Sequence, residues 1–111
     1  MNITFNDFLK VDIRVGTITE VKEFPKARNP AYQLWIDFGE TIGIKKTSAQ
    51  ITDIYEVKNL IGKQVMAVVN FPPKQIGKFM SEVLVLGVSN EEKHIVLLQP
   101  ESPVPNGQRM H

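Results

Sequence analysis

Val11-Asp-Ile-Arg-Val-Gly-Thr-Ile18 carries the pattern that is most informative about the fold. Within it, Val11, Ile13 and Val15 alternate with Asp12 and Arg14, and alternation with a period of two is typical of a strand with one buried face. After Gly16 the apolar positions shift in phase to Ile18, which predicts a bulge or sharp bend where this strand curls. A long strand that curls early in a small chain favours a closed barrel.

The rest of the chain is also dominated by strand patterns. Apolar alternation predicts a strand over 32–38, and shorter or continuous apolar runs predict strands over 42–44, 64–71, 82–88 and 94–98. Helical spacing is confined to 4–9, which begins with a capping residue, and to 48–55.

This order of elements predicts an all-β fold: a five-stranded Greek-key OB-fold barrel with short peripheral helices, in a single domain over 1–111. Periodicity alone leaves an SH3-like barrel or a small sandwich open. The segment 100–107 carries three prolines, which favour an extended tail that wraps the barrel or lies across a partner.

The composition is that of a soluble globular protein, with 42% hydrophobic and 23% charged residues. Cysteine is absent, which excludes disulfides, thiolate metal sites and cysteine nucleophiles. The first residues lack the pattern of a signal peptide, and the longest near-apolar stretch, 65–71, is far shorter than the roughly 20 residues of a membrane helix. We therefore expect a cytoplasmic protein without membrane insertion.

Residues that would support catalysis are scarce. His94 and His111 are the only histidines, and neither a phosphate loop nor a metal-ligand motif occurs. The carboxylates show no paired acid–base pattern. The sequence therefore indicates a binding module and not an enzyme, with no cofactor and no metal site.

The first candidate binding segment is 43–51, which holds Lys45, Lys46 and Ser48. A helix is expected to begin at Ser48, and the first turn of a helix has free N–H groups. Lysines and hydroxyls beside such N–H groups suit phosphate oxygens. The alternative is that Ser48 only caps this helix and that the two lysines are solvated. The surrounding 41–80 has six lysines against two acidic residues, a net charge of +4.

The second candidate segment is 70–81, which is too long and too apolar for an ordinary hairpin. Its apolar side chains are expected to be partly exposed beside lysines, an arrangement that suits stacked bases or an extended apolar peptide. The alternative is that they plug the mouth of the barrel. The residues concerned are Phe71, Ile76, Phe79 and Met80, with Pro72 and Pro73 stiffening the segment and Lys74 and Lys78 beside it.

Five ordered motifs resemble the tRNA-binding OB domain that is appended to some aminoacyl-tRNA synthetases, over about residues 7–110. They are Asp12-Ile-Arg-Val-Gly16, Phe24-Pro-Lys-Ala27, Ser48-Ala-Gln-Ile51, Val68-Val-Asn-Phe-Pro-Pro-Lys74 and Ser81-Glu-Val-Leu-Val-Leu-Gly87. The Asn-Phe-Pro-Pro version of the fourth motif and the tail are most similar to the free-standing, export-related chaperones of this family.

The resemblance implies a five-stranded OB barrel, a homodimer and no cofactor. It further implies an ATP-independent chaperone for unfolded or export-bound polypeptides with tRNA-binding capacity, or alternatively a tRNA-binding accessory protein that recognises tRNA shape through the barrel face. We expect the dimer to use apolar residues of the two ends of the chain, namely Phe5, Phe8, Val104 and Met110.

Two sets of site residues follow from the motifs and the two segments. The expected tRNA-binding residues are Lys45, Lys46, Ser48, Asn70, Pro73, Lys74, Lys78 and Ser81. The expected peptide-binding residues are Phe71, Pro72, Ile76, Phe79 and Met80.

Overall fold

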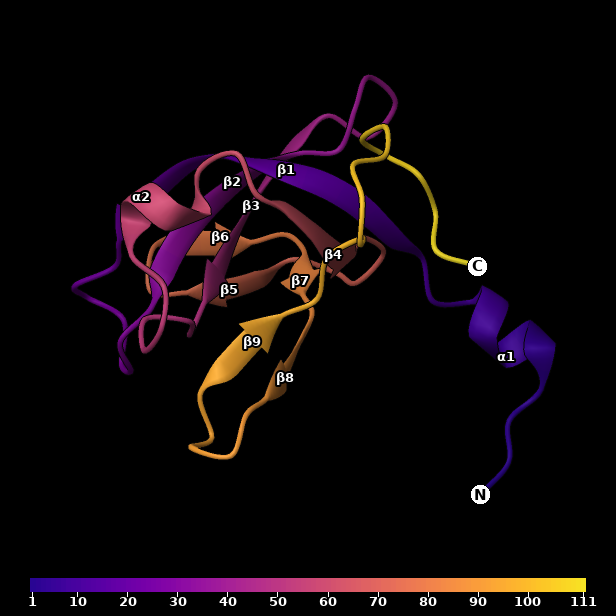
Figure 1. The fold of residues 1–111 in the computed structure, drawn as a ribbon, viewed down its shortest axis with the longest axis horizontal. Helices are drawn as coiled ribbons and strands as arrows, with labels where there is room; N and C mark the ends of the chain where they lie inside the picture. The colour runs from indigo at the N-terminus through magenta and orange to yellow at the C-terminus, as the bar shows by residue number, and fades with distance from the viewer.

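Strands account for most of the regular structure in the computed structural model, which describes residues 1–111 (Figure 1). The chain order is α1 (Phe5–Leu9), β1 (Ile13–Glu23), β2 (Tyr32–Asp37), β3 (Ile44–Ala49), α2 (Val57–Leu60), β4 (Gln64–Val68), β5 (Lys74–Ile76), β6 (Phe79–Ser81), β7 (Leu84–Val85), β8 (Gly87–Ser89) and β9 (Ile95–Leu97). Both helices are short and peripheral, so the predicted all-β class is confirmed.

The barrel is one five-stranded antiparallel sheet with the order β3-β2-β1-β4-β7. The long β1 belongs to both halves of it, because its first part pairs with β4 and its second part with β2. The register shifts between Ile18 and Glu20, shortly after Gly16. A Cβ on Gly16 would lie 2.5 Å from the Ile36 side chain, so glycine permits the close packing that lets the sheet curl. The nearly closed barrel agrees with the predicted OB-like fold.

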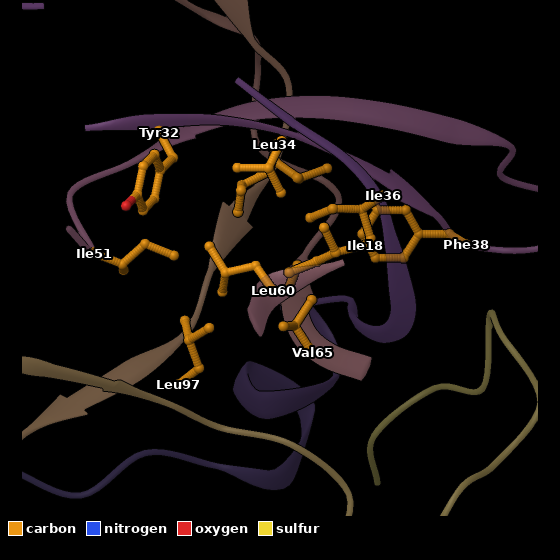
Figure 2. Packing of buried hydrophobic residues seen from close by; sticks show 12 residues of the cluster. Ile18, Tyr32, Leu34, Ile36, Phe38, Ile51, Leu60, Val65 and Leu97 are labelled. Carbon is orange, nitrogen blue, oxygen red and sulfur yellow. The ribbon is translucent and has the colours of Figure 1, made fainter. Parts of the chain in front are cut away.

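The core lies inside this barrel and is apolar (Figure 2). In β2, buried positions alternate with partly exposed ones, as the sequence pattern predicts. Leu60 is fully buried, although α2 is only one turn long, so this helix contributes to the core through one side chain. The largest fully buried apolar side chains are Ile18, Leu34, Ile36, Phe38, Leu60 and Val65.

The prediction of a helix over 48–55 is wrong. Ser48 lies in β3, where it is opposite Gln33 of β2, and the only helix in this region is α2. The ladder with β2 extends the strand to Ala49, so strand pairing overrides the helical spacing of the apolar residues that follow. Ile51 still reaches the core, from a turn-rich segment.

The run over 82–88 does not form one buried strand. It is divided into β7, which pairs with β4, and β8, which pairs with β9. Val83 is its only buried residue. The change of pairing partner between Val85 and Gly87 places most of this run at the surface.

The C-terminal tail runs beside β1, whereas the N-terminal segment with α1 extends away from the barrel (Figure 1). The tail wraps the barrel, since Gly107 N–H donates to Val15 O at 2.7 Å and Met110 N–H donates to Ile13 O at 2.8 Å. Helix α1 lies apart from the barrel and buries none of its residues. Its first turn is a capping box in which Thr4 N–H donates to the Asp7 carboxylate, and this bond lowers the pKa of Asp7.

No helix of this structure combines the length and the apolar character that a membrane crossing requires.

Candidate functional site

The main concavity of the protein is a groove of about 830 Å³. It lies where the barrel is not closed, between the end of β3, the β5–β6 hairpin and the segment that carries β7, β8 and β9. Most of its lining is hydrophobic. The lining residues are Ser48, Ala49, Gln50, Ile51, Phe71, Pro72, Lys74, Ile76, Ser81, Glu82, Val83, Leu84, Val85, Leu86, Gly87, Ile95 and Leu97.

One wall of the groove is the β5–β6 hairpin, which hydrogen bonds fix to β3. The Ser81 hydroxyl lies 2.8 Å from the Thr47 hydroxyl and accepts a hydrogen bond from Ser48 N–H at 3.1 Å. Beside it, Glu82 N–H donates to Lys46 O at 2.8 Å, and Lys46 N–H donates to the Glu82 carboxylate at 2.9 Å. These bonds close the barrel at one end of the groove and leave the other end open.

The floor and the rim of the groove differ in exposure. Ile51, Val83 and Leu97 are buried and form an apolar floor that is continuous with the core. At the rim, Phe71 is 53% exposed and Leu84 is 49% exposed. Apolar side chains that are this exposed beside a concavity are typical of an interaction surface.

Of the expected peptide-binding residues, Phe71, Pro72 and Ile76 line the groove. None of the five belongs to the buried core cluster or is among the side chains packed against it, which argues against the alternative that they plug the barrel. Phe79 and Met80 lie outside the groove lining. Met80 is 37% exposed and is paired with Gln75 on the other side of the hairpin.

Phe79 belongs to a separate aromatic cluster. Its ring centroid lies 5.4 Å from that of the buried Phe24 and 6.1 Å from that of Trp35. The Nζ atoms of Lys22 and Lys46 lie 5.1 Å and 5.3 Å from the Trp35 and Phe79 ring centroids, respectively. These contacts anchor the tip of the hairpin to the barrel.

Of the expected tRNA-binding residues, Ser48, Lys74 and Ser81 line the groove, and the other five lie outside its lining. Asn70 is occupied within the protein, since its side-chain amide donates to Lys10 O at 2.8 Å and accepts from Asp12 N–H at 3.0 Å. Pro73 is exposed at the start of the hairpin.

The lysines of the two segments lie on β3 and on the β5–β6 hairpin, and Lys46 contacts the hairpin at the Phe79 ring. Lys45 and Lys46 extend from β3 and not from a helix start, so no helix N-terminus assists them, contrary to expectation. No ion pair involves Lys45, Lys46, Lys74 or Lys78. These four charges are therefore available for an anionic partner.

The opposite wall of the groove was not predicted as a binding surface. It is formed by Val83–Gly87 together with Ile95 and Leu97. The Ser81–Gly87 motif carries most of this wall. Its alternation indicates only a strand, because the gap between β3 and β7 depends on how the whole barrel closes. No group of three His, Asp or Glu side chains is placed to hold a metal ion.

The chain matches the family model described as a putative tRNA binding domain over residues 13–109. It belongs to this family. Two methionine–tRNA ligases, from Flavobacterium johnsoniae and Methanococcoides burtonii, are each 34% identical to it over 95% and 98% of this chain, respectively. The chain spans only 14% and 16% of the length of those enzymes.

Solved structures give matches over whole chains. The crystal structure of the chaperone CsaA from Bacillus anthracis str. Ames is 52% identical, covers 100% of both chains and superposes with a TM-score of 0.93. The CsaA chaperone protein from Picrophilus torridus is 53% identical, with 99% of this chain and 100% of that chain covered and a TM-score of 0.92. The tRNA-binding family and the similarity to CsaA chaperones both agree with the resemblance found in the sequence.

Proposed function

We propose that this protein is a cytoplasmic, ATP-independent chaperone that holds unfolded or export-bound polypeptides in the groove. The observation that carries the proposal is the groove itself, with its apolar floor and its exposed rim. The whole-chain similarity to two CsaA chaperones supports it.

The physical basis of holding is the burial of apolar surface. An unfolded polypeptide exposes apolar side chains, and their transfer from water into the groove contributes roughly 25 cal/mol per Å². Pro72 and Pro73 restrict the backbone beside Phe71, so this part of the rim loses little conformational entropy on binding. Binding of this kind needs no nucleotide.

A second candidate function is tRNA binding by the lysines around the hairpin. Membership of the tRNA-binding domain family and the four unpaired lysines favour it. Phosphate contacts by lysine release counterions, so this interaction depends strongly on salt, whereas burial of apolar surface does not.

We further propose a homodimer that uses the two ends of the chain. Phe5 is 72% exposed on α1 and Met110 is 37% exposed in the tail, while Phe8 and Val104 are half-buried. The last tail residues are bonded to β1, which α1 directly precedes, and the Arg109 guanidinium donates to Leu9 O at 2.7 Å, so the two ends of the chain meet beside the start of β1. An isologous interface would cover this surface.

The test is a pair of titrations without nucleotide, one with a fluorescent unfolded polypeptide and one with tRNA, each at low and high salt. We expect polypeptide binding that changes little with salt and tRNA binding that weakens steeply. Tight binding of tRNA with no binding of polypeptide would overturn the chaperone proposal and leave tRNA binding as the function.

A further inference from the structure

An unpaired strand edge runs along one wall of the groove. This strand is the segment 84–89, and its opposite edge is paired. That edge bonds first to β4 and then to β9. At the change of partner, Leu86 N–H donates to Met66 O at 2.9 Å and Leu86 O accepts from Leu98 N–H at 3.0 Å. Leu86 thus uses both its backbone groups on the paired edge.

The neighbouring residues face the opposite way. Backbone groups of successive residues in an antiparallel strand point to alternate edges. With Leu86 directed to β4 and β9, the N–H and C=O groups of Val85 and Gly87 point to the other edge. No backbone hydrogen bond outside the ladders involves either residue.

This second edge faces the groove. Just before β7, the Val83 carbonyl accepts a hydrogen bond from the Thr47 hydroxyl of β3 at 2.7 Å, so the chain faces β3 on this side. Val85 and Gly87 line the groove beyond that bond. The groove is therefore the open part of the seam between β3 and β7, and unsatisfied backbone groups lie along it.

We infer that the groove binds its polypeptide by strand addition, with an extended segment pairing to the edge at Val85 and Gly87. This inference rests on the proposed chaperone function and specifies how the groove recognises its ligand. Main-chain hydrogen bonds are the same for every sequence, so an added strand suits a protein with many clients. Alternate side chains of the added strand enter the apolar groove, and the others face solvent.

The charges of the groove define the segment further. Its charged side chains are Lys74 and Glu82. One oxygen of the Glu82 carboxylate accepts from Lys46 N–H, whereas Lys74 is exposed and has no ion-pair partner. The complementary ligand is an extended apolar segment with an acidic residue close to one end.

The first experiment measures the affinity of the whole protein for a synthetic seven-residue apolar peptide with one terminal glutamate. The peptide is compared with variants N-methylated at each residue in turn. Methylation removes one N–H donor and leaves the protein unchanged. We expect a loss of about tenfold or more at every second residue, with little change at the residues between them.

The outcomes separate this inference from the proposed function. Binding of the unmethylated peptide without any alternation among the methylated variants would overturn strand addition and leave the chaperone proposal standing. If neither the unmethylated peptide nor any unfolded polypeptide bound, strand addition and the chaperone proposal would both be overturned. Replacement of the peptide's glutamate by glutamine should weaken binding to the natural protein but not to Lys74→Ala, and equal losses in both would overturn the acidic preference.

A second measurement observes the edge directly. In amide hydrogen exchange followed by NMR, the N–H groups of Val85 and Gly87 should become protected when the peptide is added. The N–H of Leu86 is the internal control, because it is already bonded to Met66 and should change little. Protection of all three amides to the same degree, or of none, would contradict pairing at this edge.

Discussion

The hydroxyl groups of Ser81 and Thr47 lie 2.8 Å apart and join the β5–β6 hairpin to β3. The Thr47 hydroxyl also lies 2.7 Å from Val83 O, to which it donates. Ser81 in turn accepts from Ser48 N–H at 3.1 Å. This chain of hydrogen bonds connects the two walls of the groove through the buried Thr47.

Replacement of Ser81 by alanine tests this connection. Ser81→Ala leaves Ser48 N–H without its partner, and we expect the free energy of unfolding to fall by about 1–3 kcal/mol. Urea unfolding measures this change. Ser102→Ala is the matched control, because Ser102 is exposed and makes no hydrogen bond through its side chain. Equal stability of the two variants would show that the hydroxyl chain does not hold the hairpin.

Two phenylalanines of the same segment should respond differently to truncation. Phe79→Ala removes the contacts with Phe24 and Trp35 and should lower the free energy of unfolding by about 2 kcal/mol. Phe71→Ala removes a side chain that is 53% exposed, so stability should change by less than about 0.5 kcal/mol. Thermal unfolding, followed by the fluorescence of the single tryptophan, Trp35, measures both.

The same pair separates stability from binding. Because Phe71 is at the rim of the groove, Phe71→Ala should weaken binding of unfolded polypeptide by about 2 kcal/mol, near thirtyfold. Phe79→Ala should weaken it less in the folded protein, since Phe79 does not line the groove. The reverse order of effects would place the binding surface on the aromatic cluster instead.

Much of the fold could be predicted from local sequence. The alternation in β2 matches the observed alternation of buried and partly exposed residues, and the phase shift after Gly16 matches the register shift in β1. Both could be predicted because successive side chains of a strand point to opposite faces, which is a local property. The helix expected over 48–55 failed where a long-range ladder with β2 decided the conformation. The division of 82–88 into β7 and β8 likewise depends on a change of pairing partner that local sequence does not encode.

The lysines around the hairpin give a prediction about nucleic acid. Lys74→Ala should weaken binding of all tRNAs about equally and should reduce the slope of log affinity against log salt by about one. The control is Lys93→Asn, which removes a charge in the β8–β9 turn with a residue that tolerates the positive φ of 65° there. A slope that is the same in both variants would place Lys74 outside the tRNA-binding surface.

Removal of an apolar side chain from α1 tests the proposed dimer. Phe5→Ser should shift sedimentation equilibrium toward a monomer that remains folded, because Phe5 is 72% exposed and α1 buries no residue of its own chain. Asn6→Ser, at an exposed position of the same helix, should leave association unchanged. A natural protein that is already monomeric, or a Phe5→Ser variant that remains fully dimeric, would rule out this interface.

The candidate site was less predictable than the fold. Phe71, Pro72 and Ile76 were identified because an apolar segment beside prolines and lysines is unusual for a link between strands. The other wall, from Val83 to Gly87, has an ordinary strand pattern. Its exposure follows from incomplete closure against β3, which is a property of the whole barrel.

The most direct test of the account is a map of the residues that an unfolded polypeptide contacts. Methyl and amide NMR shifts of the isotope-labelled protein are recorded as the polypeptide is added without nucleotide. We predict that the largest changes fall on both walls of the groove, at Ile76, Val85, Gly87 and Ile95, and that Ile3 of the N-terminal segment is unaffected. Changes confined to that segment or to the lysines outside the groove, with Val85 and Ile95 unmoved, would contradict the central claim.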